Sequence, residues 1–195
     1  MAAGRQAAGR QCILNQAQRL FLEHGYHGVS IRDIVQACGL SNAALYYHFG
    51  SKQHLFVEVF KDYVAVLVQQ LHEAGAGRGS CRERLASMAE AHARFMLRSR
   101  SELHGLLRDL MHCDSEEIRQ LVPEARGHIP SMFAAVLEEG IADGEIRPVD
   151  TQSVSVMLLG MISYLTSHRT YDKVGETLTE DVELAINTLF GGIGA

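Results

Sequence analysis

Residues 39–56 read GLSNAALYYHFGSKQHLF, and this stretch decides how the N-terminal part of the chain folds. Ser41 is suited to begin a helix, because a serine side chain accepts a hydrogen bond from an otherwise unpaired N–H of the first turn. The short helix that follows closes at Gly50, since glycine readily adopts the left-handed conformation found after helix ends. Ser51 then caps a longer helix. The stretch therefore predicts two capped helices separated by a single glycine.

The segment before this stretch predicts one more short helix. Ser30 is its expected N-cap, and Asp33, three residues later, completes a pattern like a capping box. Gly39 ends this helix. Residues 30–49 thus give a short capped helix, a turn that contains glycine and a second short helix. This order is typical of helix–turn–helix modules that bind DNA.

The second helix of this pair carries side chains suited to DNA. Asn42 and Ala44 are small, so the backbone can come close to a groove, while Tyr47 and His48 supply hydrogen-bonding groups. A helix N-terminus also attracts a phosphate through its N–H groups and its dipole. Lys52 adds a positive charge beside the same surface. The alternative interpretation is that these residues are ordinary caps and core positions, as we expect for Leu45, Phe49 and one of the two tyrosines, Tyr46 and Tyr47.

At this point the resemblance becomes specific. The run Leu-Tyr-x-His-Phe-x-x-Lys-x-x-Leu at residues 45–55 is similar to the DNA-binding region of the TetR (tetracycline-repressor-like) family of bacterial transcription regulators. The family pattern is also matched by Gly25-Tyr26 and by Ser30-Ile31-Arg32-Asp33-Ile34. The resemblance covers about a quarter of the chain, residues 13–56. Cys38 and Leu40 depart mildly from the family pattern, in which Ala and Val are common at these two positions.

The resemblance implies a two-fold dimer whose third helices enter successive major grooves of a palindromic operator. Carried over by position, Ser30, His48 and Lys52 would contact phosphates, and Tyr46 would lie nearer the core. Asn42, Ala44 and Tyr47 would face bases or the neighbouring backbone. The expected DNA-binding residues are therefore Ser30, Ser41, Asn42, Ala44, Tyr47, His48 and Lys52.

The charge distribution agrees with this interpretation once the chain is divided. The 195 residues carry a net charge of -5, which alone argues against nucleic-acid binding. Residues 1–55, however, hold five Lys and Arg against two Asp and Glu, a formal charge of +3, and the remainder carries −8. Such asymmetry indicates a nucleic-acid contact confined to one segment. Residues 1–11, with two Ala-Gly-Arg-Gln repeats, are expected to form a flexible basic arm or a frayed terminus with no role.

The rest of the chain shows apolar residues at helical spacing and no strand alternation, so the predicted class is all-α with about nine helices. Hydrophobic residues make up 47% of the chain, as in a packed globular protein. Pro123 and Pro130 predict a break or kink in the seventh helix. We expect a helix–turn–helix domain over 1–52 and a larger helical sensing and dimerisation domain over 53–195. Further helices are expected from Ile13, Ser51, Ser80, Ser101, about Ser115, Asp150 or Thr151, and about Thr179.

A ligand-responsive regulator needs an effector site, and family members bind a small molecule among their C-terminal helices. Methionine and aromatic residues on inward helix faces suit a pliable apolar pocket, although such stripes also form plain core. His92 interrupts an otherwise apolar face, so it is either a polar handle for a ligand or a core histidine bonded to a backbone carbonyl. The candidate ligand-binding residues are Tyr63, Leu67, Met88, His92, Phe95, Met96, Leu107, Met111, Phe133 and Tyr164.

The other classes of function find less support in the sequence. His104, His112, Cys113, Asp114 and His128 lie close together in the sequence, but their spacing matches no closed zinc site. A redox switch at Cys113 would need a depressed pKa and exposure. An enzyme is not expected, because there is no Gly-rich phosphate loop and no convincing Ser–His–Asp order. We expect no metal and no cofactor.

The expected setting and assembly complete the prediction. Scattered cysteines without C-x-x-C spacing, no signal sequence and no apolar run long enough for a membrane span predict a cytoplasmic protein. The expected partners are double-stranded operator DNA, an unknown small-molecule effector and a second copy of the chain. The last two helices are too apolar to remain exposed, so they form a dimer seam, complete the monomer core, or do both on opposite faces. The sequence therefore predicts a dimeric repressor that a ligand releases from its operator.

Overall fold

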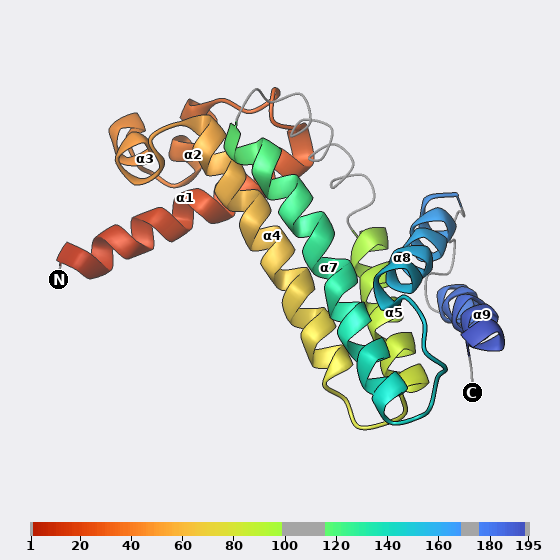
Figure 1. Ribbon diagram of the computed structural model, residues 1–195. Helices are drawn as coiled ribbons and strands as arrows, with labels where there is room; N and C mark the ends of the chain where they lie inside the picture. Colours follow the sequence, from red (N-terminus) through yellow and green to blue (C-terminus); the bar gives the residue numbers. More distant parts are fainter. Residues whose placement is uncertain (1, 99–115, 169–175, 194–195) are drawn as a thin grey trace. The chain divides into compact units, whose positions relative to one another are not determined.

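The computed structural model describes residues 2–98, 116–168 and 176–193, with side chains over 6–97, 127–166 and 178–193. All regular structure in these ranges is α-helical, which confirms the predicted class (Figure 1). The sixth helix expected after Ser101 lies outside the described residues, as do Leu107 and Met111. The helices are α1 (Ala2–His24), α2 (Ile31–Ala37), α3 (Asn42–Phe49), α4 (Lys52–Gly75), α5 (Cys81–Arg98), α7 (Glu116–Ala142), α8 (Thr151–His168) and α9 (Glu176–Ile193).

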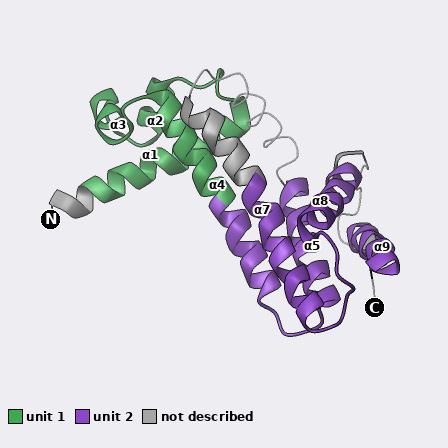
Figure 2. Cartoon of the chain, viewed as in Figure 1, with its two compact units in different colours: residues 1–64, 101–121 green, residues 65–100, 122–195 purple. Residues whose placement is uncertain are grey.

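Contacts within the chain divide it into two compact units. Unit 1 comprises residues 1–64 and 101–121, and unit 2 comprises residues 65–100 and 122–195 (Figure 2). Helix α4 therefore contributes its first residues to unit 1 and its last residues to unit 2. The functional boundary expected between residues 52 and 53 stays a prediction.

In unit 1 the ends of the short helices α2 and α3 are set by local contacts. Ser30 accepts a hydrogen bond from the Asp33 backbone N–H, and the Asp33 carboxylate accepts one from the Ser30 N–H, so the predicted capping box is present. Gly25, Gly39 and Gly50 have φ values of 72°, 64° and 69°, which suit helix ends. α1 packs against α2 and α3. The core of unit 1 includes Ile13, Phe21, Ile34, Leu45, Phe49, Leu55 and Phe56.

The expected flexible arm is wrong, because α1 already begins at Ala2. Arg10 donates to Glu58 of α4 at 2.8 Å, and its guanidinium lies 5.0 Å from the centre of the Phe49 ring. Gln11 also donates to Asn15 one turn later, at 2.9 Å. Long-range contacts and alanine-rich composition therefore extend the helix through the two repeats.

Unit 2 is a helical body in which α5 packs against α8 and α9, and α8 packs against α9. Ser80 and Glu83 form the expected capping box before α5. Asp150, rather than Thr151, caps α8, since its carboxylate accepts from the Ser153 backbone N–H at 3.2 Å. Gly140 lets α7 approach the start of α5, because a Cβ there would lie 2.6 Å from Cys81 Sγ. Fully buried members of this core include Leu71, Leu85, Met88, Phe133, Leu158 and Ile186.

Helix α7 differs from the prediction because it continues through both prolines. Pro123 and Pro130 each remove a backbone N–H, and a proline inside a helix costs about 3 kcal/mol. The stretch after Pro130 is tightly packed, with Phe133 and Leu137 fully buried. Burial of this stretch offsets the local preference, so the expected break is absent, while the alternative of a kink stays a prediction. In the part of the chain that the structure describes, every helix is too short or too polar to cross a membrane.

Candidate functional site

The first candidate site is the surface of α3 in unit 1. Ser41 caps this helix by accepting a hydrogen bond from the Ala44 backbone N–H at 3.4 Å, as predicted. Asn42 is exposed at the first turn, Ala44 is half-buried, and Tyr47 is 71% exposed. The structure therefore places the three residues expected to face bases on an accessible helix surface.

His48 and Tyr46 also belong to α3 and differ in exposure. His48 is half-buried and its ring lies 5.1 Å from that of Tyr47, edge to face. Tyr46 was expected nearer the core, but it is 51% exposed. The buried face of α3 consists of Leu45 and Phe49, four residues apart, and Tyr46 is turned about 100° away from Leu45. The α3 surface thus carries two exposed tyrosines rather than one.

Helix α1 also contributes to the α3 surface, which the sequence analysis missed. The Gln6 side-chain amide donates to the Tyr47 hydroxyl at 3.5 Å. The two residues lie 41 positions apart, and Gln6 falls in the segment that was expected to be a flexible arm. Nothing in the local pattern could have found this contact.

Ser30 is engaged within its own capping box. Its hydroxyl donates to the Asp33 carboxylate at 2.6 Å, and its backbone N–H donates to the same oxygen at 2.8 Å. These two hydrogen bonds lower the pKa of Asp33, because they stabilise the charged carboxylate. Ser30 therefore holds the start of α2, and its expected phosphate contact stays a prediction.

Lys52 lies where α4 begins and contacts the residues that precede α2. Its ammonium donates to the backbone carbonyl of Tyr26 and lies 4.0 Å from the centre of the Tyr26 ring. The Phe21 ring is 6.0 Å away. Cation–π contacts of this kind stabilise a fixed position for the charge. Lys52 thus places a positive charge on unit 1 in a defined position.

The second candidate site is the buried His92 of α5 in unit 2. Its side chain is 6% exposed, and its Nδ1 has no hydrogen-bond partner among the described residues. Burial lowers the pKa of His92 to about 4, because a low-dielectric surrounding disfavours the charged imidazolium. His92 is therefore a neutral imidazole, and among the described residues its Nδ1 has no backbone carbonyl as a partner, which the core interpretation expected.

The other ligand candidates are distributed over both units. Leu67, Met88, Phe95 and Phe133 are buried in unit 2, Met96 is half-buried there, and Tyr63 is buried in unit 1. Tyr164 was expected on an inward face, but it is 64% exposed. The buried face of α8 is centred on Leu158 and Ile162, and Tyr164 projects from the opposite face.

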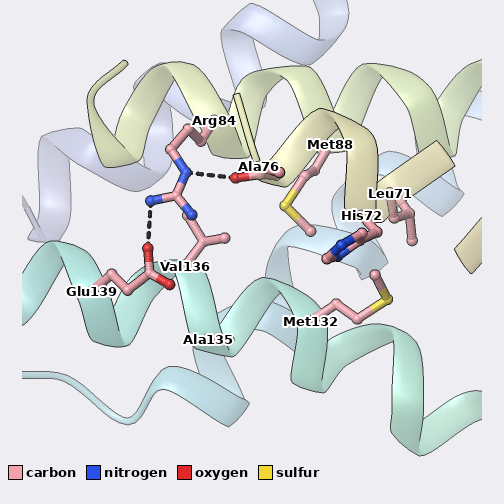
Figure 3. Close-up of a pocket in the computed structure, with 10 residues that line it drawn as sticks. Leu71, His72, Ala76, Arg84, Met88, Met132, Ala135, Val136 and Glu139 are labelled. Carbon is pink, nitrogen blue, oxygen red and sulfur yellow. Dashed lines mark hydrogen bonds and ion pairs between the residues drawn. The ribbon is translucent and has the colours of Figure 1, made fainter. Parts of the chain in front are cut away.

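A cavity of about 370 Å³ lies between the end of α4, the start of α5 and α7 (Figure 3). Met88 lines it together with Leu71 and Val136. At one side Arg84 donates to the Gly75 carbonyl at 2.6 Å and pairs with Glu139 at 2.5 Å. Because Arg84 and Glu139 are 55 residues apart, helical spacing alone could not have paired them.

Two of the predicted ligand residues line different hollows, Met88 the first and Phe95 another. Phe95 lines a second hollow of about 370 Å³ with Ala91 and Arg94 of α5 and residues of α4. His92 borders neither hollow. The effector site stays a prediction, with His92 as its distinctive polar group.

A third feature of note is the exposed apolar surface of α8 and α9. Val156, Met157 and Tyr164 of α8 are 57%, 62% and 64% exposed, and Leu184 of α9 is 59% exposed. We call these four residues the α8/α9 apolar surface. Helices α8 and α9 also bury opposite faces in the unit 2 core. The buried faces therefore complete the monomer core, and the exposed faces remain for another partner.

The metal-site alternative gains no support from the described residues, where His, Cys, Asp and Glu form no group of three placed to hold a metal ion. His128 is exposed on α7. The other residues of that alternative, His104, His112, Cys113 and Asp114, lie outside the described residues.

Comparisons with known proteins agree with the arrangement of the helices. Residues 13–59 match the sequence profile of bacterial regulatory proteins of the tetR family. Residues 78–191 match that of the tetracyclin repressor-like C-terminal domain. Together the two matches cover the helix–turn–helix and most of unit 2.

Individual relatives are similar to this chain over different lengths. The fatty acid metabolism regulator protein of Bacillus subtilis is 23% identical over 169 residues, 83% of this chain and 86% of that protein. The transcriptional repressor AcnR of Corynebacterium glutamicum is 39% identical over 66 residues, 34% of this chain and 35% of that protein. The crystal structure of the TetR family regulator PfmR from Thermus thermophilus superposes with a TM-score of 0.70 at 29% identity. That superposition covers 92% of this chain and 97% of PfmR. The chain therefore belongs to the TetR family of bacterial regulatory proteins, and it is a DNA-binding transcriptional regulator.

Proposed function

We propose that this regulator is a dimeric repressor that binds a palindromic operator through α3 and leaves it when a small molecule binds unit 2. The observation that carries the proposal is the surface of α3, where Asn42 and Tyr47 are exposed on a helix capped by Ser41. Amide and hydroxyl groups at these positions can hydrogen-bond to base edges or phosphates. The positive charge of residues 1–55 favours the same partner.

The exposure of α3 in unit 1 supports the following contacts in the proposed complex with DNA. Asn42, Ala44 and Tyr47 face the major groove, while Ser41 and the N-terminus of α3 lie near a phosphate. His48 and Lys52 supply further phosphate contacts, and Gln6 holds the Tyr47 hydroxyl. With only five Lys and Arg in residues 1–55, affinity depends on two subunits acting together rather than on a broad basic patch.

The α8/α9 apolar surface is the proposed dimer seam. Four large apolar side chains, each more than half exposed, are costly to leave in water but suit a two-fold interface between copies. Two α8 and two α9 helices would then form a four-helix bundle. In this proposal the protein acts in the cytoplasm and has no catalytic activity.

The proposed effector is apolar and carries one hydrogen-bonding group that pairs with His92 Nδ1. A buried nitrogen without a partner costs free energy, so a ligand group that satisfies it gains affinity. The relative from Bacillus subtilis is a fatty acid metabolism regulator protein, and the structurally similar regulator FadR from Bacillus subtilis forms a complex with stearoyl-CoA. Long-chain fatty acids and their CoA thioesters are therefore the first compounds to test. A ligand changes DNA binding only through different affinities for the two conformations, and a coupling of about 1–3 kcal/mol is typical.

The test measures binding to promoter DNA beside the gene by fluorescence anisotropy over a series of salt concentrations. Lys52→Gln keeps an N–H donor for the Tyr26 carbonyl but removes the charge, so affinity should fall and the salt slope should decrease by about one. Tyr47→Ala should lose operator binding without loss of helicity.

Lys61→Gln is the matched control, because Lys61 lies on α4 in the same unit and pairs with Glu58 at the surface. It should keep the affinity and the salt slope of the wild type. If Lys52→Gln and Tyr47→Ala both bind as the wild type does, the assignment of α3 and its surroundings to DNA is wrong.

A further inference from the structure

The N-terminal turns of α1 lie against α3, although the family profile begins to match only at residue 13. Gly9 and Arg10 follow Gln6 by three and four residues, so the three share one side of the helix. Each of them lies against α3 or the turn before it, and Arg10 also contacts α4. We call Gln6, Gly9 and Arg10 the α1 contact face.

Arg10 connects three helices of unit 1. Its Nη2 donates to the Glu58 carboxylate of α4 at 2.8 Å, and its guanidinium lies 5.0 Å from the centre of the Phe49 ring at the end of α3. The Glu58 side chain is 24% exposed and Phe49 is buried, so both partners have fixed positions. An ion pair and a cation–π contact both depend on geometry. Together they restrict where α1, the end of α3 and the start of α4 lie relative to one another.

The same face of α1 reaches the exposed side of α3 through Gln6. The Gln6 side-chain amide donates to the Tyr47 hydroxyl at 3.5 Å, and Tyr47 is 71% exposed. Because the hydroxyl oxygen accepts this hydrogen bond, its own proton remains for another acceptor. Between Gln6 and Arg10, a Cβ built on Gly9 would lie 3.7 Å from His48 Nε2, so the α1 backbone runs close to α3. The α1 contact face therefore borders the side of α3 that is proposed to face DNA.

We propose that the α1 contact face positions α3 for the operator. Arg10 holds the end of α3 against α4, and Gln6 leaves the Tyr47 hydroxyl as a hydrogen-bond donor toward DNA. The acceptor on the operator is a phosphate oxygen or a base-edge acceptor such as a purine N7. Arg10 acts through Glu58 and Phe49, so it is a positioning residue and not a phosphate contact. The inference rests on the proposed function, because it concerns how α3 meets the operator.

Glu58 distinguishes positioning from simple charge effects. Glu58→Met removes a negative charge from unit 1, and by charge alone it would strengthen binding to polyanionic DNA. The same substitution removes the acceptor that holds Arg10 at 2.8 Å. Loss of this contact should instead weaken operator binding, by about threefold to tenfold. The two explanations therefore predict changes of opposite sign.

The experiment measures binding of the full-length protein to promoter DNA by fluorescence anisotropy over a series of salt concentrations, with helicity followed by circular dichroism. Arg10→Met and Glu58→Met should each bind about threefold to tenfold more weakly than the wild type, with an unchanged salt slope. The double variant should bind like Arg10→Met, because the ion pair can be lost only once. Lys61→Met is the matched control, since Lys61 pairs with the same carboxylate at 3.3 Å from within α4. It should keep the wild-type affinity.

Two results would overturn the positioning role of Arg10. One is a Glu58→Met protein that binds the operator as tightly as the wild type or more tightly. The other is a salt slope that falls by about one in Arg10→Met, which would make Arg10 a phosphate contact.

Substitutions of Gln6 test the second half of the inference without risk to the fold, because Gln6 is exposed. In Gln6→Glu a carboxylate accepts the Tyr47 proton, so Tyr47 loses its donor role and operator affinity should fall by about tenfold. Gln11→Glu adds the same charge to an exposed position of α1 and should cost clearly less. In a Tyr47→Phe background, Gln6→Glu should cost no more than Gln11→Glu. An equal cost of Gln6→Glu with and without the hydroxyl would overturn the donor role of Tyr47.

The variants at Tyr47 and Lys52 separate failure of this inference from failure of the proposed function. If Tyr47→Ala and Lys52→Gln both keep the wild-type affinity, the proposed function fails and the inference falls with it. If these two variants lose affinity while Glu58→Met and Gln6→Glu keep it, α3 binds the operator and the α1 contact face does not position it.

Discussion

The two units expose different kinds of large side chain. On α3 of unit 1 the exposed residues are Tyr46 and Tyr47, and polar Asn42 and His48 lie close to them in the sequence. On unit 2 the α8/α9 apolar surface has methionine, valine and leucine beside a single tyrosine. A tyrosine can stack its ring and donate a hydrogen bond from its hydroxyl in a hydrated interface with a charged partner. Aliphatic side chains contribute most binding free energy in an interface that excludes water. This difference agrees with the proposed DNA partner for α3 and the proposed second copy of the chain for the α8/α9 apolar surface.

A charge placed in the α8/α9 apolar surface should give the largest effect. Met157→Glu puts two carboxylates near each other in the proposed seam, so the protein should become monomeric. Operator affinity should then fall by about a hundredfold or more, because the two half-sites are no longer bound together. Sedimentation velocity measures the first change and fluorescence anisotropy the second.

Val66→Glu is the control for this prediction. Val66 of α4 is 50% exposed and also lies in unit 2, but outside the α8/α9 apolar surface. This variant should stay dimeric and keep its operator affinity. A Met157→Glu protein that remains a dimer would place the seam elsewhere and remove the distinction between the two surfaces.

The polar groups of the two units differ in their burial and in their hydrogen-bond partners. In unit 1 the Ser30 and Asp33 groups pair with each other at the surface. In unit 2 His92 is buried and its Nδ1 has no partner among the described residues. A pair of hydrogen-bonded surface groups stabilises a helix end. A buried polar atom without a hydrogen-bond partner destabilises the folded unit unless a ligand supplies the partner. The stability of unit 2 should therefore respond to pH through His92.

We expect the pH dependence that His92 gives to the free energy of unfolding to be smaller than the effect of Met157→Glu. The unfolded chain binds a proton near pH 6.5, while the folded chain, with a pKa of about 4, does not. The free energy of unfolding contributed by this group is therefore fully present above pH 6.5 and falls as the pH drops toward 4. The total loss is about 3 kcal/mol at most. Urea unfolding of the wild type and His92→Leu at pH 7 and pH 5 measures it.

His92→Leu should lose less stability than the wild type between these two pH values. It should also bind the effector more weakly, because the nitrogen that pairs with the ligand is gone. His128→Leu is the control, since the His128 side chain is exposed on α7 and is already hydrated. Equal pH dependence in the wild type and His92→Leu would show that His92 is not held neutral in the folded protein.

The features that could be predicted from the sequence are those whose partners lie within four residues. The caps at Ser30, Ser41 and Ser80 and the glycine at position 50 are confirmed for this reason. The family assignment is also confirmed, because its signature lies in one continuous run.

The features that the sequence analysis missed depend on distant partners. Arg10 pairs with Glu58 and turns an expected arm into helix, and burial around Phe133 carries α7 through Pro130. Tyr164 was placed inward because α8 is apolar on more than one face, and only packing against α5 and α9 decides which face is buried. Such outcomes need the three-dimensional arrangement and not the spacing.

Substitutions of Ser41 should have the smallest effects. They distinguish its two roles, which are capping α3 and the proposed position near DNA. Ser41→Asp keeps the cap, because aspartate caps helices as well as serine does, but it brings a negative charge toward the phosphates. Its stability should match the wild type while operator affinity falls by about tenfold. Ser41→Ala loses the cap and should lower the free energy of unfolding by about 1 kcal/mol, with a smaller change in affinity.

Asp150→Ala removes the cap of α8 in unit 2 and should lower stability without changing operator affinity. Thermal unfolding and anisotropy on the three variants separate the contributions, and equal affinity of Ser41→Asp and the wild type would show that the N-terminus of α3 lies away from the DNA backbone.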